Sequence, residues 1–341
     1  IVDAPFGVEV FNKSGIRTIH ILCVQPRSRR AGCQAAGTVF LDSRGAEDEN
    51  SLPAIPMEKK PVGTGPDILG YYEENTRRML RWGPGRGEGV IHRAVWDPDS
   101  ARLRDALRSV ERRILGRLAD AAPDPVVDLG CGAGSSALWL AERLPLRVIG
   151  ITLSPLQAAL ATEAAARRGL ADRCSFLVGD FCGPFPVSAA GAAYAIESFS
   201  HAESPSGFFS RQGTLLPAGA LLMICDDFRV RDNPVSEAED PEEERWIRRF
   251  KDGWRLPSLC TVEEAARKAR EHGFDLIDDE DLSPFLRLTP RAARAVRRLF
   301  ESLPFLNPSV RSSLAGGTAL QICLRKRWIQ YRFLVFRKAS S

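Results

Sequence analysis

From residue 123 onwards, short hydrophobic stretches alternate with longer amphipathic stretches. The first kind is typical of buried strands and the second of helices that cover a sheet. Strands and helices that alternate in this way predict a mostly parallel sheet with helices on both faces. The predicted strands are 125–129, 147–153, 174–178, 192–196 and 220–225, and the predicted helices are 135–144, 155–168 and 205–213.

The regular alternation of predicted strands and helices ends after Asp227. Residues 233–254 are highly charged and predict a helix. Thr261 and Glu264 have the spacing of a capping box, which predicts that a helix begins there. A helix over 261–272, a strand that begins over 274–277, one or two helices over 290–327 and a closing strand over 329–336 complete the prediction.

The N-terminal part has a different character. Residues 1–56 show no sustained period, so we expect a poorly ordered extension, with Met57 as a natural start of the folded part. A helix is predicted over 68–82, and another from a cap at Ser100 to about Ala121. Within the folded domain, 57–341, we expect an N-terminal helical lid (66–122), a cofactor-binding core (123–228), a mainly helical acceptor lid (229–317) and a closing helix and strand (318–341).

Composition limits the class of partner. The chain has 341 residues, a net charge of +4 and 44% hydrophobic residues, enough for one large α/β core. The arginines of 102–117 alternate with apolar residues at helical spacing, which predicts the solvated face of an amphipathic helix and not a nucleic-acid groove. The sequence lacks an apolar run long enough to cross a membrane. We therefore expect a small-molecule partner, and both a monomer and a homo-oligomer remain open.

Eight cysteines are present, and no two of them form a CxxC pair. With only four histidines as well, a metal site is not expected. Several of the cysteines lie inside apolar runs, as free buried thiols do, which favours a reducing, cytoplasmic setting. The cysteines are Cys23, Cys33, Cys131, Cys174, Cys182, Cys225, Cys260 and Cys323.

The segment 126–134 carries the most informative motif. A buried strand ends in Asp128-Leu129 and runs into a glycine-rich turn that opens a helix. Glycines allow the backbone to approach a ligand closely. The spacing of Gly130, Gly132 and Gly134 departs from the GxGxxG of dinucleotide sites. An acid at Asp128 would repel a pyrophosphate but suits the ammonium group of a methionine moiety, directly or through water.

This segment resembles motif I of class I S-adenosylmethionine-dependent methyltransferases, and the resemblance extends over residues 66–338. It implies a Rossmann-like α/β fold: a seven-stranded, mostly parallel sheet with helices on both faces and a helical lid over the carboxyl ends of the strands. Three further segments, 71–76, 148–157 and 195–202, resemble the small-molecule group that contains sterol and tocopherol C-methyltransferases, cyclopropane fatty acid synthases and natural-product methyltransferases.

The resemblance implies a set of residues for S-adenosylmethionine. The second strand ends without the acid that usually holds the ribose, and Thr152 and Gln157 are expected to replace it; a helix cap and a surface glutamine are the alternatives. Asp180, after Gly179, is expected to accept from the adenine amino group, or simply to form a turn. Phe181 should lie beside the adenine ring, and Tyr71, Tyr72 and His92 should fold over the methionine end.

The acceptor should lie at the carboxyl ends of the strands, as ligands do in this fold. Glu197 and His201 follow the fourth strand there, and Glu197 also counts as a cofactor residue. We expect Glu197 to have a raised pKa or to stabilise a cation, and His201 to titrate near neutrality as a general base. A buried anchor and a loop histidine are the alternatives. Asp226 and Asp227 should end the fifth strand, with Asp227 binding the acceptor; a helix cap or a turn is the alternative.

An aromatic stripe in residues 233–317 suits an apolar acceptor, with Trp254 as a binding residue, although such a stripe also packs a core. Its members are Trp246, Phe250, Trp254, Phe285, Leu286, Phe300 and Phe305.

The favoured hypothesis is methyl transfer to carbon or oxygen of a small hydrophobic metabolite, with S-adenosylhomocysteine as the second product. Alternatives are a cyclase that keeps S-adenosylmethionine bound without net transfer and a nicotinamide-dependent oxidoreductase, which the missing GxGxxG disfavours.

Overall fold

The computed structural model describes residues 6–13, 16–23, 68–83, 85, 89–121, 123–231, 241–288 and 308–340. The first two ranges form a compact unit of their own. In it, strands β1 (Phe6–Lys13) and β2 (Ile16–Cys23) pair antiparallel, with Lys13 opposite Ile16. These strands were not predicted, because apolar residues alternate over only part of each, at Phe6, Val8 and Val10 and at Ile19, Ile21 and Cys23. The rest of residues 1–56 lies outside the described residues, and the boundary at Met57 stays a prediction.

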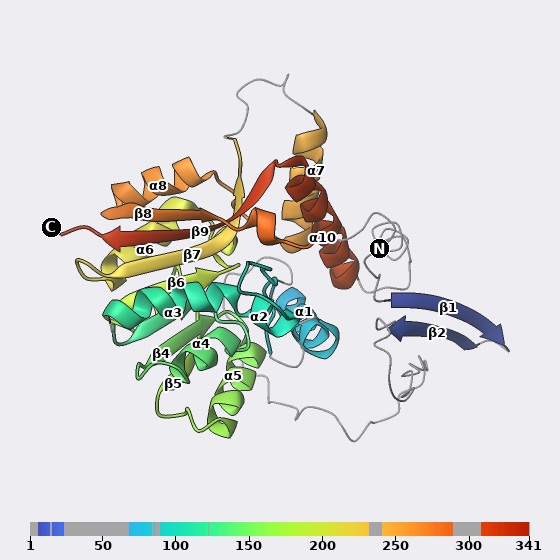
Figure 1. Ribbon diagram of the computed structural model, residues 1–341, viewed down its shortest axis with the longest axis horizontal. Helices are drawn as coiled ribbons and strands as arrows, with labels where there is room; N and C mark the ends of the chain where they lie inside the picture. The colour runs from blue at the N-terminus through green and yellow to red at the C-terminus, as the bar shows by residue number, and fades with distance from the viewer. Residues whose placement is uncertain are drawn as a thin grey trace. The chain divides into compact units, whose positions relative to one another are not determined.

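The second unit is built on a sheet with strand order β5-β4-β3-β6-β7-β9-β8 in the described part of the chain (Figure 1). The five strands from β3 to β7 are parallel, and β9 pairs antiparallel with β7 and β8. This confirms the Rossmann-like, seven-stranded fold. The strands are β3 (Val126–Leu129), β4 (Val148–Thr152), β5 (Cys174–Val178), β6 (Ala192–Ile196), β7 (Leu221–Arg229), β8 (Phe274–Asp281) and β9 (Ile329–Lys338).

Helices cover both faces of this sheet. Neighbouring residues of β3 point to opposite faces, and because all of them are buried, both faces must be covered. Val127 packs in one buried cluster with residues of α6 and α8, whereas Val126 packs in another with residues of α3 and α4. A third cluster joins α7 to α10, which lie side by side in Figure 1. The helices are α1 (Ile68–Trp82), α2 (Leu103–Leu107), α3 (Ser109–Ala121), α4 (Ser135–Ala141), α5 (Pro155–Arg167), α6 (Pro205–Leu215), α7 (Pro241–Trp254), α8 (Val262–Glu271) and α10 (Pro308–Lys326).

Two local predictions are wrong. The arginine-rich helix is interrupted at Arg108, whose backbone leaves the helical region (φ −107°, ψ 10°) between α2 and α3. The N-cap of α2 is Arg102 and not the predicted Ser100. The Ser100 hydroxyl instead donates a 2.6 Å hydrogen bond to Asp97 Oδ1. By contrast, the predicted capping box is confirmed at α8, where Thr261 Oγ1 accepts from the Glu264 amide.

Strand β7 is longer than predicted, and this changes the site. It continues to Arg229 because β9 pairs with it along its whole length, beyond the last β6 partner at Cys225. Asp226 and Asp227 therefore lie within the strand and not after it.

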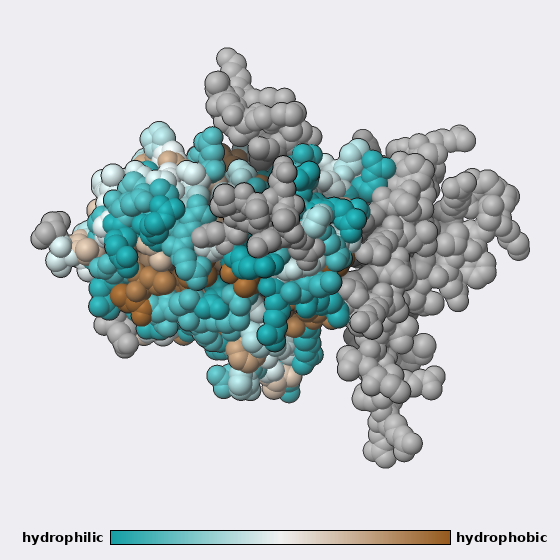
Figure 2. Space-filling view, turned by 90° about the horizontal axis from the view of Figure 1, so that it is seen from above, coloured by the Kyte–Doolittle hydropathy of each residue, from teal (hydrophilic) through white to brown (hydrophobic). Residues whose placement is uncertain are grey.

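One face of the described part is mainly polar. On the face shown in Figure 2, hydrophilic residues predominate and the brown areas are small. Among the described helices, none combines the length and the apolar character that a membrane span requires.

Candidate active site

The glycine-rich turn after β3 forms as predicted. Gly130, Gly132 and Gly134 have φ of +85°, +53° and +78°, conformations that residues with a Cβ rarely adopt. A Cβ at Gly130 would lie 2.5 Å from Ser198 Cβ, and one at Gly134 would lie 2.7 Å from Ala161 Cβ. Among the described residues, a Cβ at Gly132 would meet Ile91 Cδ1 alone, at 3.6 Å. Gly130 and Gly134 thus permit close packing, whereas Gly132 presents bare backbone to open space.

Asp128 lies beneath this turn and is buried. Its Oδ2 accepts a 2.8 Å hydrogen bond from the Tyr194 hydroxyl. Burial raises the pKa of Asp128 to about 7, and the bond from Tyr194 opposes this only in part. A cation placed beside this carboxyl would therefore favour its ionised form.

A second buried carboxylate, Glu111 of α3, adjoins the same turn, and the sequence reasoning missed it. Its Oε1 lies 3.0 Å from His92 Nε2 and accepts from Arg108 (2.7 Å) and from Ser136 at the start of α4 (3.1 Å). Burial works to raise its pKa, but His92 and Arg108 outweigh burial and lower the pKa to about 2. Its Oε2 is buried and has no hydrogen-bond partner among the described residues.

His92 is held in place by Glu111, through its Nε2. Burial would lower its pKa, but the nearby carboxylate of Glu111 outweighs burial and raises it. The other ring nitrogen, Nδ1, lies 3.1 Å from the Arg93 carbonyl oxygen. Whether His92 contacts the cofactor stays a prediction.

The predicted ribose pair is brought together. Thr152, at the end of β4, donates to Gln157 Oε1 at 2.5 Å, and Gln157 Nε2 donates to Thr76 Oγ1 of α1 at 2.7 Å. The alternative of a helix cap fails for Thr152, because Ser154 caps α5. Helix α1 thereby contacts Gln157, one of the two side chains expected to hold the ribose.

The structure of the turn after β5 is compatible with both predicted roles of Asp180, as an acceptor for the adenine amino group and as a turn former. Asp180 is exposed, and its Oδ1 accepts from the Cys182 amide at 2.8 Å, as a turn-forming aspartate does. Phe181 is buried and packs edge-on against Phe208, 5.9 Å between ring centres. Its Cε1 would lie 3.6 Å from a Cβ at Gly130, so the ring borders the glycine turn.

Tyr71 and Tyr72 lie in α1, but their side chains are outside the described residues. Their predicted contacts with the methionine end stay predictions.

Glu197 lies at the mouth of the sheet and is held by three donors. Its Oε1 accepts from the Arg93 amide, from Arg93 Nε and from the Tyr331 hydroxyl, each at 2.9 Å. Its backbone is left-handed, with φ of +51°. The expectation of a raised pKa is wrong: burial works in that direction, but Arg93 outweighs it and lowers the pKa of Glu197.

Arg93 also binds Asp227, so one guanidinium joins both acids. Its two terminal nitrogens donate to the two oxygens of Asp227 at 2.9 and 2.8 Å, and its Cζ lies 4.1 Å from the centre of the Tyr331 ring. Neighbouring Asp226 accepts from the amide and hydroxyl of Ser200 and serves as an anchor. Burial raises its pKa to about 7.

His201 ends a short 3-10 helix, Phe199–His201, after β6. The expectation that it titrates near neutrality is wrong, because burial lowers its pKa to about 4 and nearby Glu197 offsets this only in part. The imidazole is neutral at pH 7 but is a weak base. His272, by comparison, lies beside Ser206 Oγ at 3.0 Å and has a structural role.

Trp254 belongs to the packing between α7 and α10. Its Nε1 donates to the Ser313 carbonyl at 3.1 Å, and its ring lies edge-on to Phe250 at 5.3 Å. Phe250 is fully buried, so this part of the aromatic stripe packs a core. Phe285 and Leu286 pack against the cluster that contains Tyr331, whereas Phe300 and Phe305 lie outside the described residues.

Arg93 and Tyr331 are the site residues that the sequence reasoning missed at the mouth. In the sequence from Val90 to Trp96, all residues except His92 and Arg93 are apolar. A charged residue in such an apolar run predicts a buried partner of opposite charge. Tyr331 lies in a strand of alternating apolar and polar residues, where the pattern predicts only that its ring is buried in the core. Nothing in the sequence indicates a function for its hydroxyl.

These residues fit S-adenosylmethionine. The unpartnered Glu111 Oε2 and the carboxyl of Asp128 suit an ammonium group, and Thr152 with Gln157 suits hydroxyls. The left-handed glycine turn, the ribose pair and the sheet order together define a class I S-adenosylmethionine-dependent methyltransferase.

The chain belongs to the mycolic acid cyclopropane synthetase family, whose model matches residues 92–292. It is 31% identical over 297 residues to a probable chloroplastic tocopherol O-methyltransferase of Oryza sativa subsp. japonica, covering 82% of this chain and 80% of that one. Its fold is similar to that of a putative sarcosine dimethylglycine methyltransferase from Galdieria sulphuraria (TM-score 0.61, 18% identity, 78% and 98% covered). It is also similar to the [4+2]-cyclase SpnF (TM-score 0.56, 24% identity, 79% and 95% covered).

Proposed function

We propose that the enzyme methylates a carbon atom of a small hydrophobic acceptor, such as an alkene carbon, at the mouth formed by β6, β7 and β9. The observation that carries this choice is the weakness of both candidate bases. Glu197 has a lowered pKa and His201 a pKa of about 4. A general base is most effective when its pKa lies near the working pH, so neither group suits removal of a hydroxyl proton.

A carbon acceptor requires a weaker base than a hydroxyl acceptor does. When bound, S-adenosylmethionine supplies an electrophilic methyl group on a sulfonium. The π pair of the acceptor forms the new C–C bond as the C–S bond breaks, and the positive charge moves to the adjacent acceptor carbon. That carbocation is acidic enough to lose its proton to an ionised carboxylate such as Glu197, which restores the alkene.

The charges at the mouth support this sequence. Glu197, Asp227 and Arg93 carry a net charge of −1 together when all are ionised, and all three are largely buried. A negative group in a poorly solvated place stabilises a nearby cation more than water does. The ring of Tyr331 adds an aromatic face, which also attracts cations.

The test is incubation of the full chain with ¹³C-methyl S-adenosylmethionine and a panel of hydrophobic alkenes and phenols, followed by NMR of the products. Carbon transfer predicts a labelled methyl with the chemical shift of a C–CH₃ group, and Glu197→Gln should slow its formation. A labelled O–CH₃ group instead would refute carbon transfer.

Oxygen transfer is the second candidate, because the rice relative is named an O-methyltransferase. A bound cofactor without transfer is the third, because SpnF is a cyclase. Label that enters O–CH₃ supports the second, and a rearranged acceptor without label supports the third.

We also propose a cytoplasmic location. Six cysteines in the described part of the second unit are free, most of them buried, which is compatible with a reducing compartment. Fractionation of the producing cells with an antibody against the chain tests this, and recovery outside the cytoplasm would contradict it.

A further inference from the structure

The two acids beside the glycine turn have different partners. Arg108 donates to Glu111, and His92 Nε2 lies 3.0 Å from it. The carboxyl of Asp128 accepts, among the described residues, only the 2.8 Å hydrogen bond from the Tyr194 hydroxyl to its Oδ2. A buried carboxylate without a cation is unfavourable, because the protein interior solvates a charge poorly. Asp128 therefore lacks the partner that its negative charge requires.

The strand register fixes the position of Tyr194. Tyr194 of β6 is the direct partner of Asp128 in the parallel pairing of β6 with β3. Val126 lies two residues before Asp128, on the same face of the strand, and packs in the same buried cluster as Tyr194. Asp128 and Tyr194 are 3% and 0% exposed. Two neighbouring strands, and not a loop, thus hold the hydroxyl against the carboxyl.

The Tyr194 hydroxyl is a neutral donor. Burial, together with the nearby carboxyl of Asp128, raises the pKa of Tyr194 well above its usual value, so the hydroxyl keeps its proton. A hydrogen bond to an ionised carboxylate favours that form, but this bond brings no positive charge. An arginine or a lysine in the place of Tyr194 would neutralise the carboxylate. With tyrosine, the negative charge stays available for the cation of a ligand.

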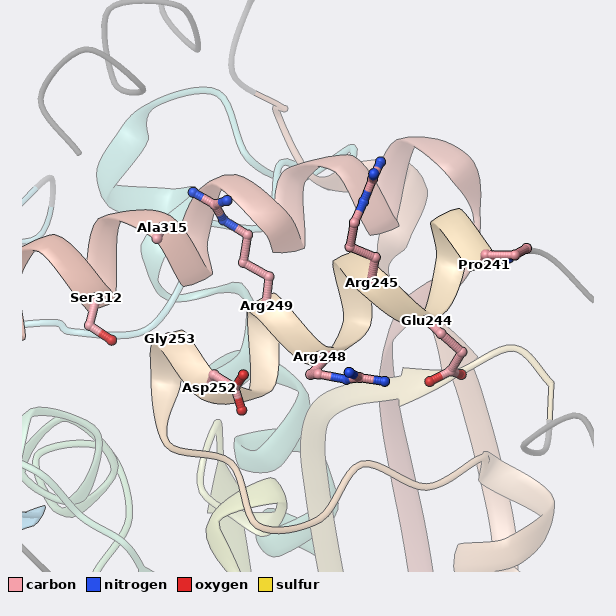
Figure 3. Close-up of a pocket in the computed structure, with 9 residues that line it drawn as sticks. All are labelled: Pro241, Glu244, Arg245, Arg248, Arg249, Asp252, Gly253, Ser312 and Ala315. Carbon is pink, nitrogen blue, oxygen red and sulfur yellow. The ribbon is translucent and has the colours of Figure 1, made fainter. Parts of the chain in front are cut away.

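Exposed charged groups, by comparison, require no ligand. The hollow between α7 and α10 in Figure 3 is lined by such groups. Its arginines are exposed, so that water stabilises their charge; they are Arg245, Arg248 and Arg249. The carboxyl of Asp128 is shielded from water by its burial. A cation that compensates its charge therefore has to come from a bound molecule.

We propose that Tyr194 is a positioning residue for S-adenosylmethionine: its hydroxyl holds one oxygen of the Asp128 carboxylate and leaves the other for the ammonium group of the cofactor. The ammonium group supplies the cation that Asp128 lacks in the protein. Tyr194 acts on the cofactor through Asp128. This role rests on S-adenosylmethionine as the cofactor and does not depend on which acceptor atom is methylated.

Cofactor binding should then depend on pH. Burial raises the pKa of the Asp128 carboxyl to about 7, against the effect of the bond from Tyr194, and the ammonium group binds the ionised form. A carboxyl with this pKa is about 90% ionised at pH 8 and about 10% ionised at pH 6. The affinity should therefore fall about tenfold between these two pH values.

Three other titratable groups face Asp128. Glu111, with a pKa of about 2, is ionised throughout this range, and burial raises the pKa of Cys131 so far that its thiol stays neutral. His92 has a raised pKa and can titrate within the range, and its protonation would also weaken binding, because it repels the ammonium group. Removal of the Tyr194 hydroxyl distinguishes the two origins, since this hydroxyl bonds to Asp128 and, among the described residues, not to His92.

Calorimetric titration of the full chain with S-adenosylhomocysteine between pH 8 and pH 6 tests the proposal. For the wild type we expect a midpoint near pH 7. In Tyr194→Phe the carboxyl loses the donor that favours its ionised form, so the midpoint should move upward by roughly 0.5–1 pH unit. Ser200→Ala is the matched control and should keep the wild-type midpoint, because it removes a hydroxyl that donates to another buried aspartate, Asp226, at 3.1 Å.

Circular dichroism shows which variants are folded at each pH. Equal affinity of the wild type at pH 8 and pH 6 would overturn the proposal, and so would an unchanged midpoint in folded Tyr194→Phe or the same upward shift in Ser200→Ala. If Tyr194→Phe does not fold, His92→Gln takes its place: a fall in affinity that persists without the imidazole supports titration of Asp128, and a flat profile refutes it. Absence of binding by the wild type at pH 8 would instead contradict the cofactor itself.

Discussion

Arg93 and Asp227 are joined by two parallel hydrogen bonds, from the two terminal guanidinium nitrogens to the two carboxylate oxygens, at 2.9 and 2.8 Å. The remaining Nε of Arg93 donates to Glu197. A single side chain from the segment before α2 therefore fixes acids of β7 and of the loop after β6. This arrangement sets the charge at the mouth of the active site.

Loss of Arg93 should therefore be costly. Arg93→Met leaves two buried carboxylates without their cation, and we expect the free energy of unfolding to fall by about 3–5 kcal/mol, as is typical when one partner of a buried pair is removed. Urea denaturation at pH 7 measures this. Arg167→Met is the control, because its ion pair with Glu163 is exposed and should contribute below about 1 kcal/mol. Equal losses in the two variants would contradict the arrangement.

His201 should make the protein sensitive to acid. Its pKa is about 4 in the folded chain against 6.5 for the ordinary group, so the unfolded chain binds the proton more readily. The stabilisation is complete above pH 6.5 and is lost as the pH falls to about 4, by about 3 kcal/mol. Unfolding free energies between pH 8 and pH 4 should fall more steeply for the wild type than for His201→Gln. Parallel pH profiles would show that the imidazole is not buried as described.

Gly134 should not tolerate alanine. Its φ is +78°, and a Cβ there would lie 2.7 Å from Ala161 Cβ and 2.8 Å from Phe176. Gly169 also has a positive φ, +68°, but a Cβ there meets no atom of the described residues within 4 Å. Gly169→Ala should cost about 1 kcal/mol for the backbone conformation alone, and Gly134→Ala should cost roughly 1–3 kcal/mol more for the overlap. Thermal unfolding of the two variants compares them, and a smaller loss at Gly134 would refute the close packing.

Gln157 should matter for cofactor affinity more than for stability. Gln157→Leu removes the amide that contacts Thr152 and Thr76. We expect S-adenosylhomocysteine to bind about tenfold more weakly, which corresponds to the loss of about one hydrogen bond. Thr162→Val is the control on the same helix, because the Thr162 hydroxyl bonds only to the Ala158 carbonyl among the described residues. Unchanged affinity in Gln157→Leu would remove this side chain from the ribose site.

Much of the fold could be predicted because local pattern and topology agree. The strand over 174–178 and the helix over 68–82 have the predicted bounds, and the glycine turn adopts the left-handed conformations that its sequence requires. The end of β7 could not be predicted, because two adjacent aspartates resemble the end of a strand. Only pairing with β9, about a hundred residues further along the chain, extends it.

Glu197 and Asp227 both bind Arg93, but the charges around them could not be predicted from the sequence. The residues that hold Glu197 come from the segment before α2 and from β9, and sequence order gives no sign that they meet. Burial alone would raise the pKa of the Glu197 carboxyl, whereas Arg93 lowers this pKa and keeps the carboxyl ionised. The same holds for Glu111: it lies within the arginine-rich stretch 102–117, whose pattern is typical of a solvated face, but its side chain is completely buried.

The account depends most on the glycine turn as the binding site of S-adenosylmethionine. Calorimetric titration of S-adenosylhomocysteine into the wild type and Gly132→Ala tests it directly, because among the described residues the added methyl group approaches Ile91 alone, at 3.6 Å, so it changes the turn without a clash there. We predict saturable binding at one site in the wild type and strongly weakened binding in a variant that is still folded. No binding by the wild type, or equal binding by the folded variant, would contradict the account.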